Sequence, residues 1–180
     1  VKTKERLQKA GFGEDILTIR HMNFANVDEA GQEDGPFDFV LADLGVSSMQ
    51  IDNPERGFSY KTDGPLDLRM NPQKGQSAAE RLLELTEEEL AGLLWENSDE
   101  PYAEEIAAKV IETFQKGGRI EKTGDFRQVI EQALAFLPEK ERKDAVTKSC
   151  KRCFQALRID VNSEFEVLYD FLQKLPQTLA

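Results

Sequence analysis

The feature that most constrains the fold is a short apolar segment followed by almost thirty residues without periodicity. Residues 37–43, with the sequence FDFVLAD, form a near-continuous apolar run that ends in Asp43. Such a run is typical of a strand buried on both faces, as in a parallel sheet. Residues 44–72 follow neither the helical nor the strand period. Loops this long are usually functional or disordered, and the apolar residues in this one favour an ordered, functional loop.

The residues before this loop predict alternating structure. A charged helix is expected over residues 3–10 and a short β-branched strand over residues 16–20. The sequence GQEDGP, residues 31–36, predicts a turn before the strand at 37–43. Strand, helix and strand at this spacing indicate an α/β fold.

Beyond residue 76 the pattern is helical. Thr86 and Glu89 form the capping-box signature of a helix start. Helices are expected over residues 77–85, 86–97, 102–116, 125–136 and 151–174. In the last of these, the expected core residues are Phe154, Leu157, Val161, Phe165, Leu168 and Leu172. We therefore expect an inserted all-helical domain at 71–145, within an α/β domain made of 1–70 and 146–180.

The charge of the chain is unevenly distributed. The formal net charge is -11, which taken alone argues against a nucleic-acid partner. Residues 140–158, however, hold seven basic and two acidic side chains, a local charge of +5. This segment is either a phosphate-binding patch or a solvated helix face. Its candidate RNA-binding residues are Lys148, Lys151, Arg152 and Arg158.

Cysteine and histidine usage predicts no metal site. Cys150 and Cys153 form a C-x-x-C pair, but zinc needs four ligands and His21 is the only histidine. Free cysteines suit a reducing cytoplasm. No apolar run reaches membrane-spanning length, and the first residues do not resemble a signal peptide. A cytoplasmic protein without a membrane partner is expected.

The loop after Asp43 is the candidate site. In open α/β sheets, ligands bind beyond the carboxyl ends of the strands, and Asp43 lies at such an end. Gly45 allows close backbone approach, while Ser47 and Gln50 offer neutral donors and acceptors. Alternatively, Asp43 only caps the next turn and the loop packs on the helical block. Ion pairs are expected to order the loop, between Asp52, Glu55, Asp63 or Asp67 and Arg56, Lys61 or Arg69.

Two stretches resemble known signatures. Residues 43–80, DLGVSSMQIDNPERGFSYKTDGPLDLRMNPQKGQSAAE, and residues 151–164, KRCFQALRIDVNSE, are similar to the two signatures of the MraW (RsmH) family. The order and separation of the two stretches also match. The resemblance implies a class I, Rossmann-like methyltransferase domain with a helical insert. It implies methylation of the exocyclic N4 of a cytidine in small-subunit ribosomal RNA, within the ribosomal particle, with S-adenosylmethionine as the cofactor.

The resemblance also assigns residues. Phe24, Asp43 and Gln50 match positions that contact the cofactor in the family. The N4 lone pair of cytosine is conjugated with the ring, so an acceptor beside the N–H bonds favours attack on the methyl group. Asp43 is either that acceptor, and so catalytic, or only a cofactor ligand. A stacked base would have to be flipped out to react, and the 140–158 segment would hold the RNA phosphates.

The sequence departs from the family at several points. Residues 1–13, VKTKERLQKAGFG, are similar to the helix that follows the family's second strand, so the Gly-rich turn and the acidic residue that holds the ribose are missing ahead of it, and the family's next strand is missing after residue 180. The chain is therefore expected to be an inactive fragment that can self-associate through unpaired strand edges. Lys148-Ser149 replaces a usual His-Pro, and Cys153 replaces a Thr that would mark the helix start. A non-catalytic RNA- or protein-binding helical module is the alternative function.

Overall fold

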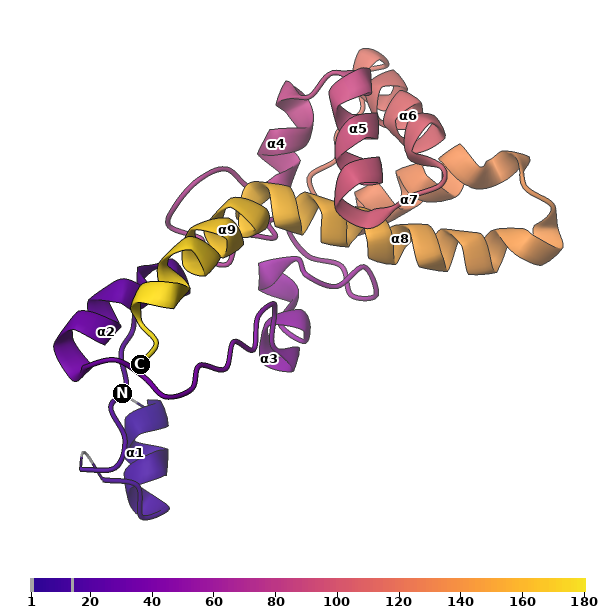
Figure 1. Cartoon of the computed structure of the whole chain (residues 1–180). Coiled ribbons are helices and arrows are strands. Elements are labelled where there is room, and N and C mark those ends of the chain that lie inside the picture. Colours follow the sequence, from indigo (N-terminus) through magenta and orange to yellow (C-terminus); the bar gives the residue numbers. More distant parts are fainter. Residues whose placement is uncertain (1, 14) are drawn as a thin grey trace. The chain divides into compact units, whose positions relative to one another are not determined.

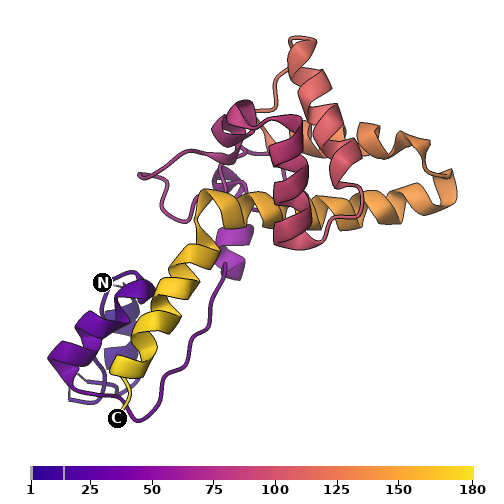
Figure 2. The ribbon, with the colours of Figure 1, turned by 45° about the horizontal axis from the view of Figure 1, so that its top comes forward.

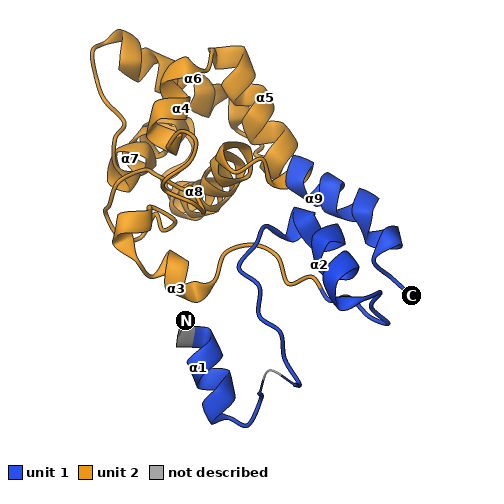
Figure 3. Cartoon of the chain, turned by 90° about the vertical axis from the view of Figure 1, so that its left-hand side faces the viewer, with its two compact units in different colours: residues 1–41, 166–180 blue, residues 42–165 orange. Residues whose placement is uncertain are grey.

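The computed structural model describes residues 2–13 and 15–180 (Figure 1). Over these residues the chain is helical, with two isolated β-bridges and no strand. Contacts divide the chain into two compact units, residues 1–41 with 166–180 and residues 42–165 (Figure 3). The second unit is larger than the expected insert at 71–145, because it also includes residues 42–70 and 146–165. The boundaries of an inserted domain stay a prediction about the whole protein.

The larger unit, residues 42–165, is built around one long helix. Helices α4, α5 and α7 pack against α8, and α6 packs against α5 and α7 (Figure 2). The helices are α3 (Ser48–Ile51), α4 (Ala78–Glu84), α5 (Glu87–Ser98), α6 (Ala103–Gln115), α7 (Thr123–Ala133) and α8 (Glu139–Val161). Two 3-10 helices, η2 (Pro54–Arg56) and η3 (Leu134–Phe136), complete it.

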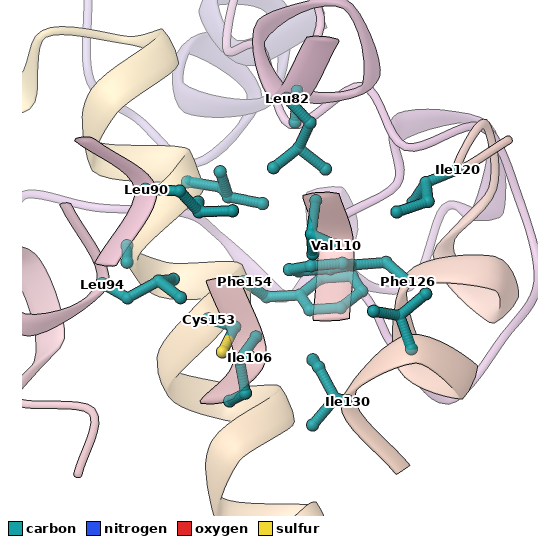
Figure 4. Packing of buried hydrophobic residues seen from close by; sticks show 14 of the residues in the cluster. Leu82, Leu90, Leu94, Ile106, Val110, Ile120, Phe126, Ile130, Cys153 and Phe154 are labelled. Atoms are coloured by element: carbon teal, nitrogen blue, oxygen red, sulfur yellow. The ribbon is translucent and has the colours of Figure 1, made fainter. Parts of the chain in front are cut away.

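The core of this unit surrounds Phe154 of α8 (Figure 4). The Phe154 ring lies 5.6 Å from the ring of Phe126 in α7 and 6.0 Å from the ring of Tyr60 in the loop. Leu90 of α5 and Ile106 of α6 are fully buried nearby. Burial of each such side chain contributes about 1.5–3 kcal/mol, so this unit has a core of its own.

Helices α4 to α7 confirm the expectation from the sequence. Ser77 and Thr86 cap α4 and α5, each in a reciprocal arrangement with the glutamate three residues later. The expectation for the last helix was wrong. The structure has α8, which starts at Glu139, and a separate α9 (Glu164–Lys174), with Ser163 between them at a φ of 47°. The start of α8 therefore does not depend on Cys153.

The apolar face expected for the last helix is only partly buried. Phe154 and Leu157 are in the core, as predicted, whereas Phe165 and Leu172 of α9 are 52% and 53% exposed. Beyond the break at Ser163 the buried apolar residue of α9 is Phe171, which the expected face did not include.

The smaller unit, residues 1–41 with 166–180, has few buried side chains. It contains α1 (Lys2–Lys9), η1 (Phe24–Asn26), α2 (Val27–Asp34), residues 166–174 of α9 and η4 (Leu175–Gln177). Among its described apolar side chains only Ala25 and Phe171 are buried. The Phe37 N–H donates to the Thr178 carbonyl at 2.8 Å, and the Ala180 N–H donates to the Phe37 carbonyl at 3.0 Å. These bonds join the two sequence segments of the unit.

The strands expected at 16–20 and 37–43 do not form. A strand is stabilised by ladder bonds to a neighbour, and of the residues in these two segments that the structure describes, only Phe37 forms a bridge, with Leu179. Phe39 and Leu41 are 77% and 79% exposed, so the apolar run does not form a core here. The turn expected at 31–36 is also wrong, because α2 continues to Asp34 and ends at Gly35 with a φ of 88°. The Rossmann-like sheet and self-association through its edges stay predictions.

Candidate functional site

The loop after Asp43 contains two short helices that its sequence did not predict, α3 and η2. Asp43 itself caps no helix, because the N-cap residue of α3 is Ser47. Gly45 adopts a φ of 102°, which side chains rarely allow, and so turns the chain between Asp43 and α3. Asp43 therefore does not cap α3, the next helix along the chain.

Asp43 and Gln50 have polar atoms available to a ligand. The Asp43 carboxylate is exposed and accepts no hydrogen bond from the described residues. The Gln50 Oε1 atom accepts from the backbone N–H of Ser47 at 2.9 Å and from Ser47 Oγ at 3.2 Å. These bonds fix the Gln50 side chain at the start of α3, while its Nε2 donors have no partner in the described structure.

Two glycines allow the loop to cross itself. A Cβ atom on Gly64 would lie 2.1 Å from the carbonyl oxygen of Pro54, and one on Gly57 would lie 2.1 Å from that of Pro65. Both contacts are with backbone atoms, so no side-chain movement would relieve them. Gly57 also has a φ of 68°. The loop path between Pro54 and Pro65 therefore requires both glycines.

The loop is held against the segment before α7. Pro65 forms an antiparallel bridge with Lys122, and the Leu66 N–H donates to the Glu121 carbonyl at 2.9 Å. The Thr123 N–H donates to the Gly64 carbonyl at 2.9 Å, and Thr123 Oγ1 accepts from the Gly64 N–H at 3.1 Å. Leu66 is buried as a result. The loop is thus part of the core of its unit.

One ion pair and one arginine order the middle of the loop. Asp67 accepts from Arg69 Nε at 2.7 Å and from Arg69 Nη2 at 2.8 Å, so this expected ion pair is confirmed. Burial raises the pKa of Asp67, but the Arg69 hydrogen bonds outweigh burial and the pKa is lowered. Arg56 pairs with no carboxylate in the described residues. Its Nη2 donates to the carbonyl oxygens of Arg69 and Met70, at 2.8 Å each.

Asn162 joins this loop to the end of α8. Its Nδ2 donates to the carbonyl oxygens of Leu68 and Arg158, at 2.8 Å each, and its Oδ1 accepts from the Met70 N–H at 2.7 Å. Arg81 of α4 adds a second link, because its Nε lies 2.8 Å from Asp160 Oδ2. The two signature-like stretches, 43–80 and 151–164, therefore meet in space.

The basic residues singled out on α8 differ in their partners. Lys151 is exposed and makes no ion pair in the described structure, whereas Lys148 pairs with the exposed Asp144 at 2.7 Å. Arg158 is mostly buried, and its Nε and Nη2 donate to both carboxylate oxygens of Glu164 at 2.7 and 3.1 Å. Lys148, Lys151 and the partly exposed Arg152 are thus more accessible to an anionic partner than Arg158.

Residues around the two cysteines are structural. Cys150 and Cys153 are free thiols in the core, and burial raises the pKa of Cys150 to about 12. Neither is therefore a nucleophile at neutral pH. Ser149 donates from Oγ to Glu100 Oε1 at 2.8 Å and so satisfies one oxygen of a buried carboxylate.

Phe24 lies in the smaller unit, in η1. Its ring is 38% exposed and meets the buried ring of Phe171 edge to face, with the centroids 5.5 Å apart. The N-cap residue of η1, Asn23, accepts from the Ala25 N–H at 3.0 Å. The Phe24 ring is therefore partly accessible to a ligand.

Comparison with known protein families gives a match that covers both signature-like stretches. A sequence model of the MraW methylase family matches residues 2–180. The chain belongs to this family. A ribosomal RNA small subunit methyltransferase H 1 from Agathobacter rectalis is 65% identical over 178 residues, which cover 99% of this chain and 51% of that protein. The H 1 protein of Lachnoclostridium phytofermentans is 62% identical over 180 residues, 100% of this chain and 49% of the relative.

A third relative matches a similar share of this chain. The ribosomal RNA small subunit methyltransferase H 2 of Alkaliphilus metalliredigens is 59% identical over 179 residues, 99% of this chain and 51% of its own length. The chain thus spans about half the length of the curated relatives it matches.

Three residues that shape the loop of the candidate site were not predicted from the sequence. Asn162 lies inside the second signature, but only the fold shows that it reaches Leu68. Gly57 and Gly64 lie inside the first signature, and their spacing gave no sign that the loop crosses itself. An Asn just after a long amphipathic helix is the signal that was available, because Asn is a frequent residue at helix ends.

Proposed function

We propose that the protein containing these residues methylates the exocyclic N4 of a cytidine in small-subunit ribosomal RNA, with S-adenosylmethionine as methyl donor. The observation that carries the proposal is the MraW methylase family match over residues 2–180. The relatives at 59–65% identity are named as ribosomal RNA small subunit methyltransferases, which supports the substrate class.

The cofactor site is proposed to use Phe24, Asp43 and Gln50. When bound, S-adenosylmethionine supplies an electrophilic methyl group. The residues fit such a ligand, because an adenosine needs an apolar ring face and a few polar contacts. Phe24 offers a partly exposed ring, and among the described residues neither the Asp43 carboxylate nor the Gln50 Nε2 donors have a partner. Phe24 belongs to a different compact unit from Asp43 and Gln50, so their convergence on one ligand is part of the proposal.

Asp43 has two possible roles in methyl transfer. As an acceptor for the N4–H bonds, its carboxylate would draw the lone pair out of conjugation and stabilise the positive charge that develops on N4. As a cofactor ligand, it would only hold the adenosine. The carboxylate is exposed and has no partner among the residues that the structure describes, which is compatible with both roles. In either case, alignment of the reacting atoms would further raise the rate of methyl transfer.

RNA is proposed to contact the exposed face of α8. Lys148, Lys151 and Arg152 would hold phosphates, and Arg158 would contribute less because Glu164 already neutralises it. The target base would be unstacked to reach the cofactor. Among the helices described, none is long and apolar enough to cross a bilayer. A cytoplasmic ribosomal particle is the proposed setting.

The experiment is transfer of a labelled methyl group to undermethylated small-subunit particles by the whole protein. Digestion of the RNA to nucleosides should show the label on N4-methylcytidine. Label on another base or ring position would contradict the proposed atom. Particle binding without any label transfer would favour the non-catalytic helical module, for which the complete core of residues 42–165 is the supporting observation.

A further inference from the structure

An open cavity lies beside α5 and the start of α6, apart from the loop after Asp43. Its volume is about 800 Å³. Its lining includes Glu87, Glu88, Trp95, Glu100, Glu104 and Glu105. None of these residues belongs to either signature-like stretch, so the proposed methyl transfer gives this cavity no role.

The cavity wall carries negative charge without compensation. Glu87, Glu88, Glu104 and Glu105 are exposed, and none has an ion pair or a side-chain hydrogen bond within residues 2–13 and 15–180. No lining residue is basic. Acidic residues in the first turns of α5 and α6 are favourable for the helix dipoles alone, so these four do not by themselves indicate a ligand.

A buried carboxylate in the same lining points to a cation. Glu100 is fully buried, and its Oε1 accepts from Ser149 Oγ at 2.8 Å and from the Tyr102 N–H at 3.2 Å. Its Oε2 is buried with no hydrogen-bond partner in the described structure. An unpaired buried carboxylate oxygen is costly. A positive charge in the cavity would lower this cost through its field, even without direct contact.

The aromatic side chain that lines the cavity, Trp95, also favours a positively charged ligand. Trp95 is 59% exposed although it is a large apolar side chain. Ala91 and Gly92 beside it are small, and a Cβ atom on Gly92 would meet no other atom within 4 Å. The indole face is thus accessible. Indole is the aromatic group that attracts Arg and Lys side chains most strongly.

We propose that this cavity binds an arginine- or lysine-rich peptide segment of a protein partner. A guanidinium group can stack on Trp95 while neighbouring basic side chains pair with the free glutamates. RNA is disfavoured because the charged side chains of the lining are all carboxylates, which would repel its phosphates. A metal ion is disfavoured too, since no group of three or more potential ligands suited to a metal occurs in the described residues.

Trp95 makes the test direct, because it is the only tryptophan in the chain. Nona-arginine and nona-glutamate are titrated separately into the chain while tryptophan fluorescence is followed. Nona-arginine should give a saturable change and nona-glutamate none. Calorimetry with Trp95→Ala should show weaker binding of nona-arginine, since the stacking surface is lost. Absence of a saturable change would overturn the proposal, as would binding of oligo-uridylate as tight as that of nona-arginine.

A matched pair of double variants separates the cavity from general attraction to an acidic chain. Glu88→Gln with Glu104→Gln removes two charges from the cavity wall. Glu139→Gln with Glu141→Gln removes two exposed charges from the first turn of α8, which is not part of the lining. The cavity variant should weaken nona-arginine binding about tenfold and the α8 variant less than about twofold. Equal weakening by the two variants would show that net charge alone attracts the peptide.

Discussion

Asn162 donates a hydrogen bond from Nδ2 to the carbonyl oxygen of Leu68 at 2.8 Å, across 94 positions of the sequence. The same side chain accepts from the Met70 N–H and donates to the Arg158 carbonyl oxygen. Leu68 needs such support because it is buried with a φ of 63°, which is uncommon for a residue with a side chain. One side chain thus fixes the strained end of the loop onto α8.

Replacement of Asn162 should destabilise the larger unit. Asn162→Ala removes three hydrogen bonds, each of which contributes about 1 kcal/mol, so we expect a loss of about 2–3 kcal/mol in the free energy of unfolding. The measurement is urea denaturation followed by circular dichroism. Asn97→Ala is the control, because Asn97 makes one long bond of 3.3 Å to the Ala156 carbonyl oxygen. A loss no larger than that of the control would contradict the role of Asn162.

Two glycine substitutions should change stability in opposite directions. Gly64→Ala places a methyl group against the Pro54 carbonyl, so the backbone must move and we expect a loss of more than about 2 kcal/mol. Gly92→Ala lies inside α5 with open space around it, and should stabilise the chain by about 0.5–1 kcal/mol through higher helix propensity. Denaturation midpoints of both variants check this. A Gly64→Ala protein as stable as the wild type would show that the loop does not cross as described.

The Asp67–Arg69 pair should make stability depend on acid pH. The pKa of Asp67 is lower in the folded chain than its ordinary value of 3.8, because Arg69 outweighs the effect of burial. A lowered pKa adds stability above the ordinary value, and that stability is lost as the pH falls through the folded-state pKa. Asp67→Asn should therefore be less stable than wild type at about pH 7 and lose less stability on acidification below about pH 4.

The control for this pH series is Asp170→Asn, whose carboxylate is exposed and has no ion pair within the described residues. Its denaturation midpoints should follow those of the wild type at each pH. If Asp67→Asn also follows the wild type, the ion pair does not contribute to the acid sensitivity of the chain.

The helices of the larger unit could be predicted because their signals are local. Thr86 and Glu89 are three residues apart, and Leu90, Leu93 and Leu94 mark one face of the same helix. The break at Ser163 and the strands could not be predicted this way. Residues 37–43 have strand composition, but a strand also needs a neighbour, which the residues themselves do not specify.

The position of the candidate site in the sequence could be predicted, but the contacts that shape it could not. The long loop and Asp43 stood out from the sequence, whereas the roles of Gln50 and Phe24 came from a family resemblance. The Asn162 link and the crossing at Gly57 and Gly64 depend on contacts between distant segments, so no local pattern could reveal them.

The basic face of α8 should contribute to RNA binding by the whole protein. Lys148→Glu, Lys151→Glu and Arg152→Glu together should weaken binding to small-subunit particles and reduce its salt dependence, because phosphate contacts release counterions. Binding at several salt concentrations is the measurement. The matched triple variant is Lys116→Glu, Arg119→Glu and Lys122→Glu, three exposed residues around the α6–α7 connection. Equal losses in both variants would assign the effect to total charge.

The 180-residue chain alone should bind S-adenosylmethionine negligibly. Asp43 is exposed to solvent, and so are the apolar side chains of Phe39 and Leu41, which precede it in the sequence. A ligand there would gain little from burial. Calorimetric titration of the purified chain checks this. A dissociation constant in the micromolar range would mean that Phe24, Asp43 and Gln50 suffice for binding.

The role of Asp43 in methyl transfer is the central claim, and the most direct measurement compares Asp43→Asn with wild type in the whole protein. Turnover on small-subunit particles and affinity for S-adenosylmethionine are measured side by side. If Asp43 accepts from N4 in the transition state, turnover should fall about hundredfold or more while cofactor affinity changes little. If Asp43 only holds the cofactor, affinity should fall as well. Unchanged turnover and unchanged affinity would contradict both roles and the placement of the site at this loop.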